Sequence, residues 1–273
     1  MAGAAAAATG QALKAADFAY AKASSVGDAL EMLARPGARV LAGGQSLIPS
    51  LNMRLSSPEL LVDITGLKAL AGISVQNDRV RIGALATHAQ IGRSPEVRRH
   101  VPLLAQAVPH VAHAAIRNRG SIGGSLALAD PAAEYPAVAV ALEATLFILG
   151  PGGERRVKAA GFFKGLFETD LKPGELLTSV EFPVASPSDR SAFLELARRH
   201  GDYAIIGVAA HNARFVFFGA GDKPILIKGS TKREAKENLL KGLQPSADLY
   251  HSAAAKRHLA GVLLERAWTM LST

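Results

Sequence analysis

The sequence contains no cysteine among its 273 residues. Its absence excludes disulfide bonds, cysteine nucleophiles and thiolate-held metals, iron–sulfur clusters among them, from this chain. A chain without disulfides suits a reducing compartment, so we expect a cytoplasmic protein.

Aromatic residues are scarce, at 5% of the chain, and none is interleaved with basic runs such as "EVRRH" and "ERRVK". The net charge of +8 is a surplus that can attract nucleic acid, an anionic cofactor or an acidic partner. Single-stranded nucleic acid needs aromatic rings on which its bases can stack. We therefore expect no nucleic-acid binding.

Long apolar runs are missing as well. The longest, "AVAVALEATLFILG", is interrupted by Glu143 and is too short to span a bilayer. The alanine-rich start, "MAGAAAAATGQALKAAD", lacks the charged first region and strongly apolar middle of a signal peptide. We interpret residues 1–17 as a disordered or frayed tail and expect no membrane span.

Helical and strand patterns alternate in the first part of the chain, which indicates an α/β region. "SSVGDALEMLA" offers Ser25 as an N-cap with Asp28 three positions later, followed by apolar residues at helical spacing. "RVLA", "ELLVDIT" and "VRIGALAT" read as strands, and the pattern from Pro102 to Ile116 predicts a helix.

A Pro-Gly turn in "DLKPGELLTSVEFP" opens a different pattern. "AFLELARRH", "YAIIGVAAH" and "ARFVFFGAG" are strand-like with short connections, which predicts an antiparallel sheet. Two amphipathic helices, "TKREAKENLLKGL" and "SAAAKRHLAGVLLERAWTML", follow. We therefore expect an α+β protein with a first domain over residues 18–176 and a C-terminal domain over 177–273.

Two glycine pairs carry the chemical signal: "AGGQS" at residues 42–46 and "SIGGS" at 121–125. Glycine pairs permit positive φ and let successive N–H groups converge on an anionic oxygen, for which phosphate is the usual ligand. Neither stretch matches the phosphate-binding loop that ends in Lys-Ser/Thr, nor the six-residue dinucleotide fingerprint. Each pair alone is also typical of a tight turn, whereas two together suit a diphosphate held from both sides.

At this level of detail a resemblance emerges. "AGGQSLIPSLNMRLSSPELLVDI" and "IRNRGSIGGSLALADPAAEYPAV" resemble the two flavin motifs of the medium subunit of molybdenum hydroxylases. That family includes carbon monoxide dehydrogenase medium chains and the FAD domain of xanthine dehydrogenase. "ARRHGDYAIIGVAA" and "KRHLAGVLLERA" resemble its C-terminal domain, so the similarity runs from about Phe18 to the end.

The resemblance implies FAD as cofactor and a PCMH-type fold, in which two small α/β subdomains precede a C-terminal antiparallel sheet with helices. It implies an electron-transfer role beside a large molybdopterin subunit and a small [2Fe-2S] subunit, in a dimer of heterotrimers. The final acceptor would be NAD, a quinone or oxygen. Because this chain has no cysteine, a partner would have to hold the clusters.

The family's site residues carry over onto matching positions of this sequence. The FAD pyrophosphate would be held by Ala42, Gly43, Gly44, Gln45 and Ser46. The opposing cradle would be formed by Ser121, Ile122, Gly123, Gly124 and Ser125.

Three further positions complete this set. Glu134 matches an acid that accepts from the hydroxyl-bearing chain of FAD, Leu177 an apolar contact near the flavin ring, and Tyr203 an aromatic against the ring. Asp130 is the rival acid, but Asp-Pro here is more simply a helix N-cap followed by proline at the first helical position. For Tyr203 the alternative is a strand tyrosine in the core.

Other readings of the sequence stay open. A free-standing flavin oxidase would need polar and titratable groups near the ring. A scaffold protein without functional flavin is suggested by "GVAAHNARFVFFGAG", which is short where the relatives carry an extra turn. His110 and His113 could share a helix face, but no third metal ligand is evident. We expect no metal and no catalytic acid–base residue in this chain.

Overall fold

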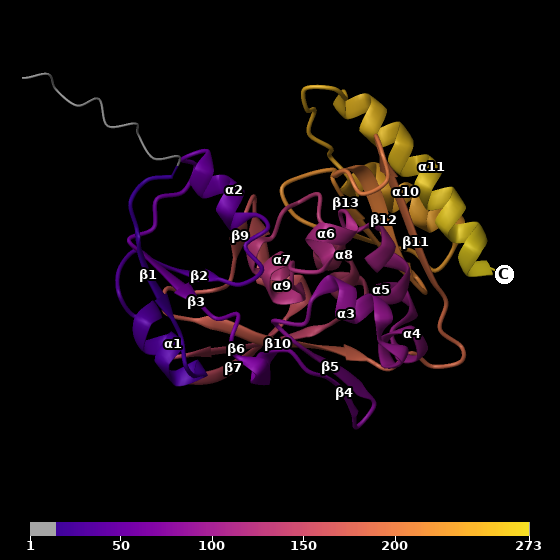
Figure 1. Ribbon diagram of the computed structural model, residues 1–273. Helices are drawn as coiled ribbons and strands as arrows, with labels where there is room; N and C mark the ends of the chain where they lie inside the picture. The colour runs from indigo at the N-terminus through magenta and orange to yellow at the C-terminus, as the bar shows by residue number, and fades with distance from the viewer. Residues whose placement is uncertain (1–14, 273) are drawn as a thin grey trace, which may run out of the picture.

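The computed structural model describes residues 15–272. Residues 1–14 of the expected tail and Thr273 lie outside this described part. The first unit is a three-stranded parallel sheet with strand order β1-β3-β2 (Figure 1). Its elements are β1 (Ala19–Lys22), α1 (Val26–Leu33), β2 (Ala38–Leu41), α2 (Leu47–Asn52) and β3 (Leu60–Asp63). The expected cap is confirmed, because the N–H of Asp28 donates to Oγ of Ser25.

The second unit contains a five-stranded sheet with the order β4-β5-β10-β6-β7. Its strands are β4 (Ile73–Gln76), β5 (Arg79–Gly83), β6 (Thr145–Gly150), β7 (Gly153–Lys158) and β10 (Leu176–Pro183). All the paired strands in it run antiparallel. For the pairs β4–β5 and β6–β7 the reason lies in the connections, since turns at 77–78 and 151–152 are too short for a parallel crossover. Parallel pairing is thus confined to the first unit.

A layer of short helices lies between this sheet and the C-terminal sheet (Figure 1). It comprises α3 (His88–Arg93), α4 (Pro95–His100), α5 (Pro102–Ala107), η2 (Val108–His110), α6 (Ala114–Arg117), α7 (Ile122–Leu128), α8 (Glu134–Ala141) and α9 (Ala159–Phe162). The helix predicted from Pro102 to Ile116 is wrong as one element, for it breaks into α5, η2 and α6. Pro109 has no N–H for the helical ladder, and Ala112 has a φ of 45°.

Small elements fill the remaining connections of this unit. η1 (Lys68–Leu70) precedes β4, while β8 (Phe163–Gly165) and β9 (Glu168–Thr169) form a separate two-stranded sheet. None of the helices within residues 15–272 combines the length and the apolarity needed to cross a membrane.

The C-terminal unit is the expected antiparallel sheet, with the order β11-β12-β13-β14. Its strands are β11 (Ser191–Ala197), β12 (Ala204–His211), β13 (Arg214–Phe218) and β14 (Ile225–Lys228), and its helices are α10 (Lys232–Gly242) and α11 (Ala253–Ser272). One face packs on the helical layer and the other on α10 and α11. The expected division at residue 177 falls inside β10, a strand of the middle sheet, so we propose that this unit begins after Pro183.

Gly207, in the middle of β12, is required by close packing. A Cβ there would lie 2.1 Å from Cζ of Phe218, whose buried ring stacks on Phe193 with the ring centroids 5.6 Å apart. The bare backbone of Gly207 therefore lets Phe218 fill the space between the sheet and the helical layer.

We expect Gly207→Ala to lower the free energy of unfolding by about 1–3 kcal/mol, because the added methyl overpacks this core. The matched control is Gly261→Ala in α11, where a Cβ would meet no atom within 4 Å. That change should raise stability by roughly 0.5–1 kcal/mol, the usual difference between alanine and glycine inside a helix. Urea denaturation of both variants measures this; similar effects in both would contradict the packing explanation.

Candidate functional site

The loop from Ala42 to Ser46, between β2 and α2, carries unused backbone donors. Among residues 15–272, the N–H groups of residues 43–46 donate to no protein acceptor. Ser46 begins α2 without a capping bond from its hydroxyl, and this residue is exposed. The side chain of Gln45 turns back, with Nε2 donating to the carbonyl of Gly43 at 2.9 Å. A row of free N–H groups beside an exposed hydroxyl can bind an anionic oxygen.

The two glycines of this loop are needed for different reasons. Gly44 has a φ of 73°, in the left-handed region that glycine adopts without cost. A Cβ on Gly43 would lie 2.2 Å from the carbonyl oxygen of Arg119. The first glycine loop thus lies directly against the chain that leads into the second, from Arg119 through Gly120 to Ser121.

The second loop, Ser121 to Ser125, has its backbone donors already engaged. The N–H of Ile122 donates to Ala86, and that of Gly123 to Ala84. The N–H groups of Gly124 and Ser125 donate to Oγ and to the carbonyl of Ser121, respectively, the N-cap of α7. These four N–H groups serve the fold, so the loop differs from the donor cradle that the sequence suggests.

Gly124 still presents a bare surface. It is exposed and its φ is not positive, and a Cβ there would meet only Oγ of Ser121, at 3.2 Å. By contrast, Gly123 is packed, since its Cβ would lie 2.4 Å from Cβ of Ala84. Backbone strain does not require glycine at position 124, and the one tight contact of an added Cβ would be with the hydroxyl of Ser121.

Two buried side chains beneath this loop were not anticipated from the sequence. The ring of His88 stands edge-on to Tyr135, with the centroids 5.1 Å apart, and a Cβ on Gly120 would lie 2.6 Å from Nε2 of His88. Burial, followed by the nearby charge of Arg117, lowers the pKa of His88 to about 4, so this histidine is neutral. Nδ1 of His88 and Oη of Tyr135 are buried without a hydrogen-bond partner among the described residues. No motif or spacing in the sequence marks this pair.

Glu134 is the first residue of α8 and is buried, with 8% of its surface exposed. Burial, and after it the charge of Asp130, raises its pKa to about 7. The prediction that Asp130 caps a helix is wrong, because the N-cap of α8 is Ala133. Oδ1 of Asp130 instead accepts from the N–H of Ala132 at 2.9 Å, which closes the turn before α8. Asp130 therefore stabilises the turn before α8, whereas Glu134 is the first residue of the helix itself.

Tyr203 lies just before β12 with 73% of its surface exposed, so the alternative of a core strand tyrosine is wrong. Burial of its hydroxyl raises the pKa of Tyr203, and the charges of Asp130 and Glu134 raise it further. The tyrosine therefore lies near the start of α8 with its ring uncovered. Leu177 is buried in β10, beside the irregularity in the pairing of β10 with β6.

His110 and His113 do not share one helix face. His110 ends η2, whereas His113 precedes α6. His110 instead contacts His200, with the ring centroids 5.8 Å apart. Among residues 15–272, no three His, Asp or Glu side chains are grouped so as to hold a metal ion.

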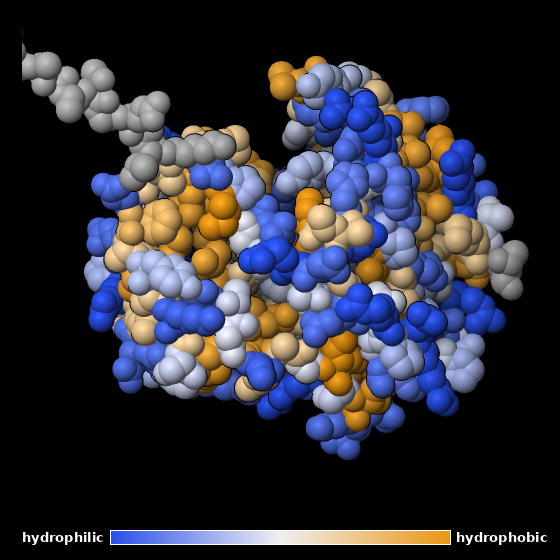
Figure 2. Space-filling model, viewed as in Figure 1, coloured by the Kyte–Doolittle hydropathy of each residue, from blue (hydrophilic) through white to orange (hydrophobic). Residues whose placement is uncertain are grey.

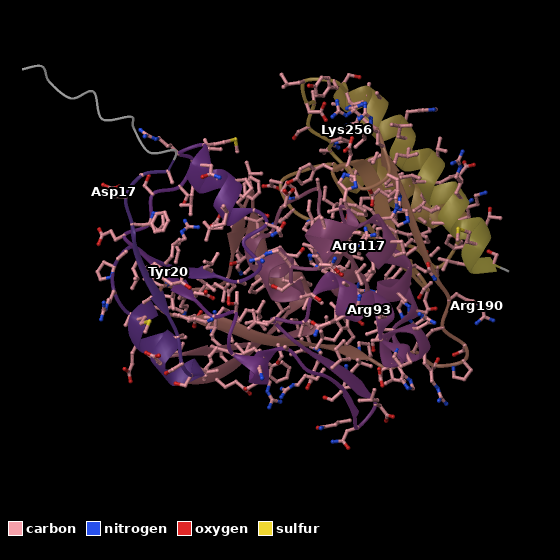
Figure 3. The ribbon with its side chains drawn as sticks, viewed as in Figure 1. Asp17, Tyr20, Arg93, Arg117, Arg190 and Lys256 are labelled. Carbon is pink, nitrogen blue, oxygen red and sulfur yellow. The ribbon has the colours of Figure 1, made fainter. Side chains whose placement is uncertain are left out.

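The surface is hollowed between α2 and the segment that precedes α11, above α6 and α7 (Figure 2). Arg117 comes from α6 on this side of the molecule (Figure 3). Its guanidinium donates to the carbonyls of Val111 and Ala112, at 2.9 and 2.6 Å, so it holds the turn before α6 in place.

Comparison with known proteins agrees with this geometry. Residues 16–185 match the family model described as the FAD binding domain in molybdopterin dehydrogenase. The chain is 37% identical to the 6-hydroxypseudooxynicotine dehydrogenase complex subunit alpha of Paenarthrobacter nicotinovorans, over 93% of this chain and 94% of the relative. It is 33% identical to the carbon monoxide dehydrogenase medium chain of Hydrogenophaga pseudoflava, over 92% and 95% of the two chains.

Solved structures show the same fold. A chain of carbon monoxide dehydrogenase from Hydrogenophaga pseudoflava aligns with a TM-score of 0.90 at 31% identity, covering 94% of this chain and 98% of that one. A chain of quinoline 2-oxidoreductase from Pseudomonas putida 86 aligns with a TM-score of 0.88 at 35% identity, with the same coverage. The protein therefore belongs to the family of FAD-binding domains in molybdopterin dehydrogenases, and it is an oxidoreductase subunit whose cofactor is FAD.

Proposed function

We propose that this chain is the electron-transferring medium subunit of a three-subunit molybdenum hydroxylase. Its partners would be a large molybdopterin subunit and a small [2Fe-2S] subunit, assembled as a dimer of heterotrimers in the cytoplasm. The chain would receive electrons from the clusters of the small subunit and pass them to NAD, a quinone or oxygen. The observation that carries this proposal is that a chain without cysteine spans nearly the full length of relatives named as medium chains or complex subunits.

The described residues fit FAD in three ways. The free N–H groups of residues 43–46, with the hydroxyl of Ser46, suit the pyrophosphate. Gly124 and the hydroxyl of Ser125 leave room for its other side, so Ser121, Ile122 and Gly123 would shape this surface rather than donate to it. Glu134 offers a carboxylate to a hydroxyl of the cofactor.

Bound FAD would supply the two-electron redox chemistry, and the protein positions and shields it. Tyr203, with its ring uncovered, would lie against one face of the flavin, and the buried Leu177 would provide an apolar contact. Ala42 would bring the loop from β2 to the pyrophosphate.

The assembly itself can be tested by purifying the chain from its native host under mild conditions. We expect it to co-purify with one large and one small subunit, and substrate should reduce the flavin only when both are present. Reduction of the isolated chain by a substrate would instead support a free-standing flavin oxidase.

We expect one FAD per chain, bound without a covalent link, since the candidate loops contain no cysteine or histidine to attach it. Denaturation of the loaded protein should release all of the flavin into the supernatant, which absorbance measures. Flavin that stays with the precipitated chain, or failure of the chain to bind stoichiometric FAD, would contradict the prediction.

Gly44→Val and Gly124→Val should each weaken FAD binding by at least ~100-fold. At Gly44 the branched side chain would keep the donors of residues 43–46 from the phosphate, and each lost charge-assisted hydrogen bond costs about 1.5–3 kcal/mol. At Gly124, whose own N–H donates to Ser121, the side chain would instead fill the exposed surface that the cofactor needs.

The matched controls are Gly153→Val at the start of β7, also at positive φ, and Gly152→Val in the β6–β7 turn, and at both positions a Cβ would meet no atom within 4 Å. Gly44→Val and Gly153→Val should share a backbone strain of about 1–3 kcal/mol. Titration with FAD measures affinity, and near-wild-type binding by both site variants would place the pyrophosphate elsewhere.

Tyr203→Ala should leave the fold almost unchanged and alter the flavin. An exposed residue contributes within about 0.5 kcal/mol to stability, whereas a ring-on-ring contact is worth ~0.5–1.5 kcal/mol, so FAD affinity should fall by up to roughly tenfold. The control is Tyr250→Ala, since Tyr250 is exposed to a similar degree, 72% against 73%. Melting temperature and the spectrum of the bound flavin, recorded on one sample, decide this: an unaltered spectrum in Tyr203→Ala would remove the tyrosine from the ring.

A further inference from the structure

Glu195 of β11 is a buried acid that the family's site residues do not include. Alternate residues of a strand point to opposite faces of the sheet. Phe193 belongs to the core shared with the helical layer, while Leu194 and Leu196 pack with α11. Glu195 therefore lies on the side of the helical layer, where its side chain is 2% exposed.

The carboxyl group of Glu195 lacks a donor. Its Oε2 is buried without a hydrogen-bond partner among the described residues, and Nδ1 of His110 lies 3.8 Å away, beyond hydrogen-bond reach. Burial, and then the neighbouring His200, lowers the pKa of His110. Both groups are thus driven toward their neutral forms, so they form no strong ion pair at neutral pH. An ionised carboxylate without a partner would be costly in this place.

The sheet brings Glu195 close to the start of α8. Glu195 pairs with Gly207 of β12, which pairs in turn with the last residue of β13. The next residue, Gly219, donates its N–H to the carbonyl of Pro131, in the turn before α8, at 2.7 Å. Burial, and after it the charge of Glu134, raises the pKa of Glu195 to about 8. The strand pairing and this hydrogen bond therefore place Glu195 near the turn that leads into Glu134, at the boundary between the sheet and the helical layer.

We propose that Glu195 is a positioning residue that carries a proton of its own, so that Glu134 can ionise and accept from a hydroxyl group of FAD. Two like charges in one buried place do not both ionise readily, and the pair titrates as a unit. This inference rests on the proposed function, because bound FAD supplies the hydroxyl group from which Glu134 would accept. Glu195 itself acts through Glu134.

Other titratable groups border the pair on each element packed around it. They are His110 on η2, Asp130 in the turn before α8, and His200 and Tyr203 in the connection from β11 to β12. Asp130 adds a further negative charge when ionised, and burial raises its pKa. The surroundings therefore favour a neutral carboxyl at one of the two glutamates.

The direction of the pH dependence follows from the pKa of Glu195, about 8 against an ordinary 4.5. Below pH 8 the residue is mainly protonated. Above it, a second negative charge appears beside Glu134 and near the pyrophosphate, so FAD affinity should fall as the pH rises through 8. The stability of the chain without FAD should likewise be highest below the ordinary pKa and should decline as the pH rises through 8, because the folded state binds the proton more tightly.

The test uses the full chain with two neutral replacements of similar volume, Glu195→Gln and Glu195→Met. The control is Glu237→Gln on α10, where the side chain is 56% exposed. FAD affinity is titrated from pH 6 to 9.5. Wild type and Glu237→Gln should lose roughly tenfold in affinity across pH 8, which corresponds to a shift of one pKa unit in Glu195 on binding. Both Glu195 variants should show no such loss.

Unfolding of the FAD-free protein over the same pH range gives the second measurement. Wild type should lose stability from pH 6 to about 8 and level off above that, and the Glu195 variants should lose less. If wild type binds no FAD, the proposed function is wrong, while this second profile still tests the proton on Glu195. Three outcomes would overturn the inference: Glu195→Gln loses FAD affinity with pH as wild type does, the FAD affinity of wild type does not change with pH, or both neutral variants fail to fold. The last outcome would mean that Glu195 needs its charge.

Discussion

The contact of Gly43 with the backbone of Arg119 is the constraint on which the site depends. A Cβ at Gly43 would lie 2.2 Å from the carbonyl oxygen of Arg119, far inside van der Waals contact, so any other residue would push the loops apart. This contact joins two units that have separate sheets and separate cores. It brings the free N–H groups of residues 43–46 beside the chain that continues into Gly124. In the proposed site, a pyrophosphate would therefore depend first on bare backbone and only then on polar side chains.

The two glycine loops differ in what they offer a ligand: the first has free N–H donors, and the second has a fixed surface. N–H groups of the second loop donate to the carbonyls of Ala84 and Ala86, in the segment after β5, so they are not available to a ligand. A loop fixed in this way cannot adjust to a ligand, but it offers a rigid surface against which the more open first loop can close. His88 lies below it and packs against Gly120, which limits movement from beneath. Rigidity on one side and free donors on the other suit a ligand held between them.

Local signals in the sequence predicted much of this fold, and distant contacts account for what they missed. Strand-like runs with short connections located β12 and β13, and the Ser25 cap identified α1, because each depends on neighbouring residues alone. The helix predicted from Pro102 to Ile116 failed as one element because Pro109 lacks an N–H for the helical ladder and Ala112 has a left-handed φ of 45°. The glycine loops were found by composition, yet the use of their N–H groups depends on Ala84 and Ala86, far away in the sequence. Glu195 gave no signal, since burial cannot be read from one acid in a strand.

The buried acids raise a problem that protonation can solve. In the proposed site, FAD would bring negative charge close to Asp130, Glu134 and Glu195, and burial raises the pKa of all three. The chain carries a surplus of +8, but Arg117, a cation on α6, is committed to two backbone carbonyls. A neutral acid costs far less to bury than an ionised one, and it still leaves its partner free to accept a hydrogen bond. The low-dielectric layer between the sheets thus makes a protonated carboxyl the least costly way to keep one acceptor charged beside an anionic cofactor.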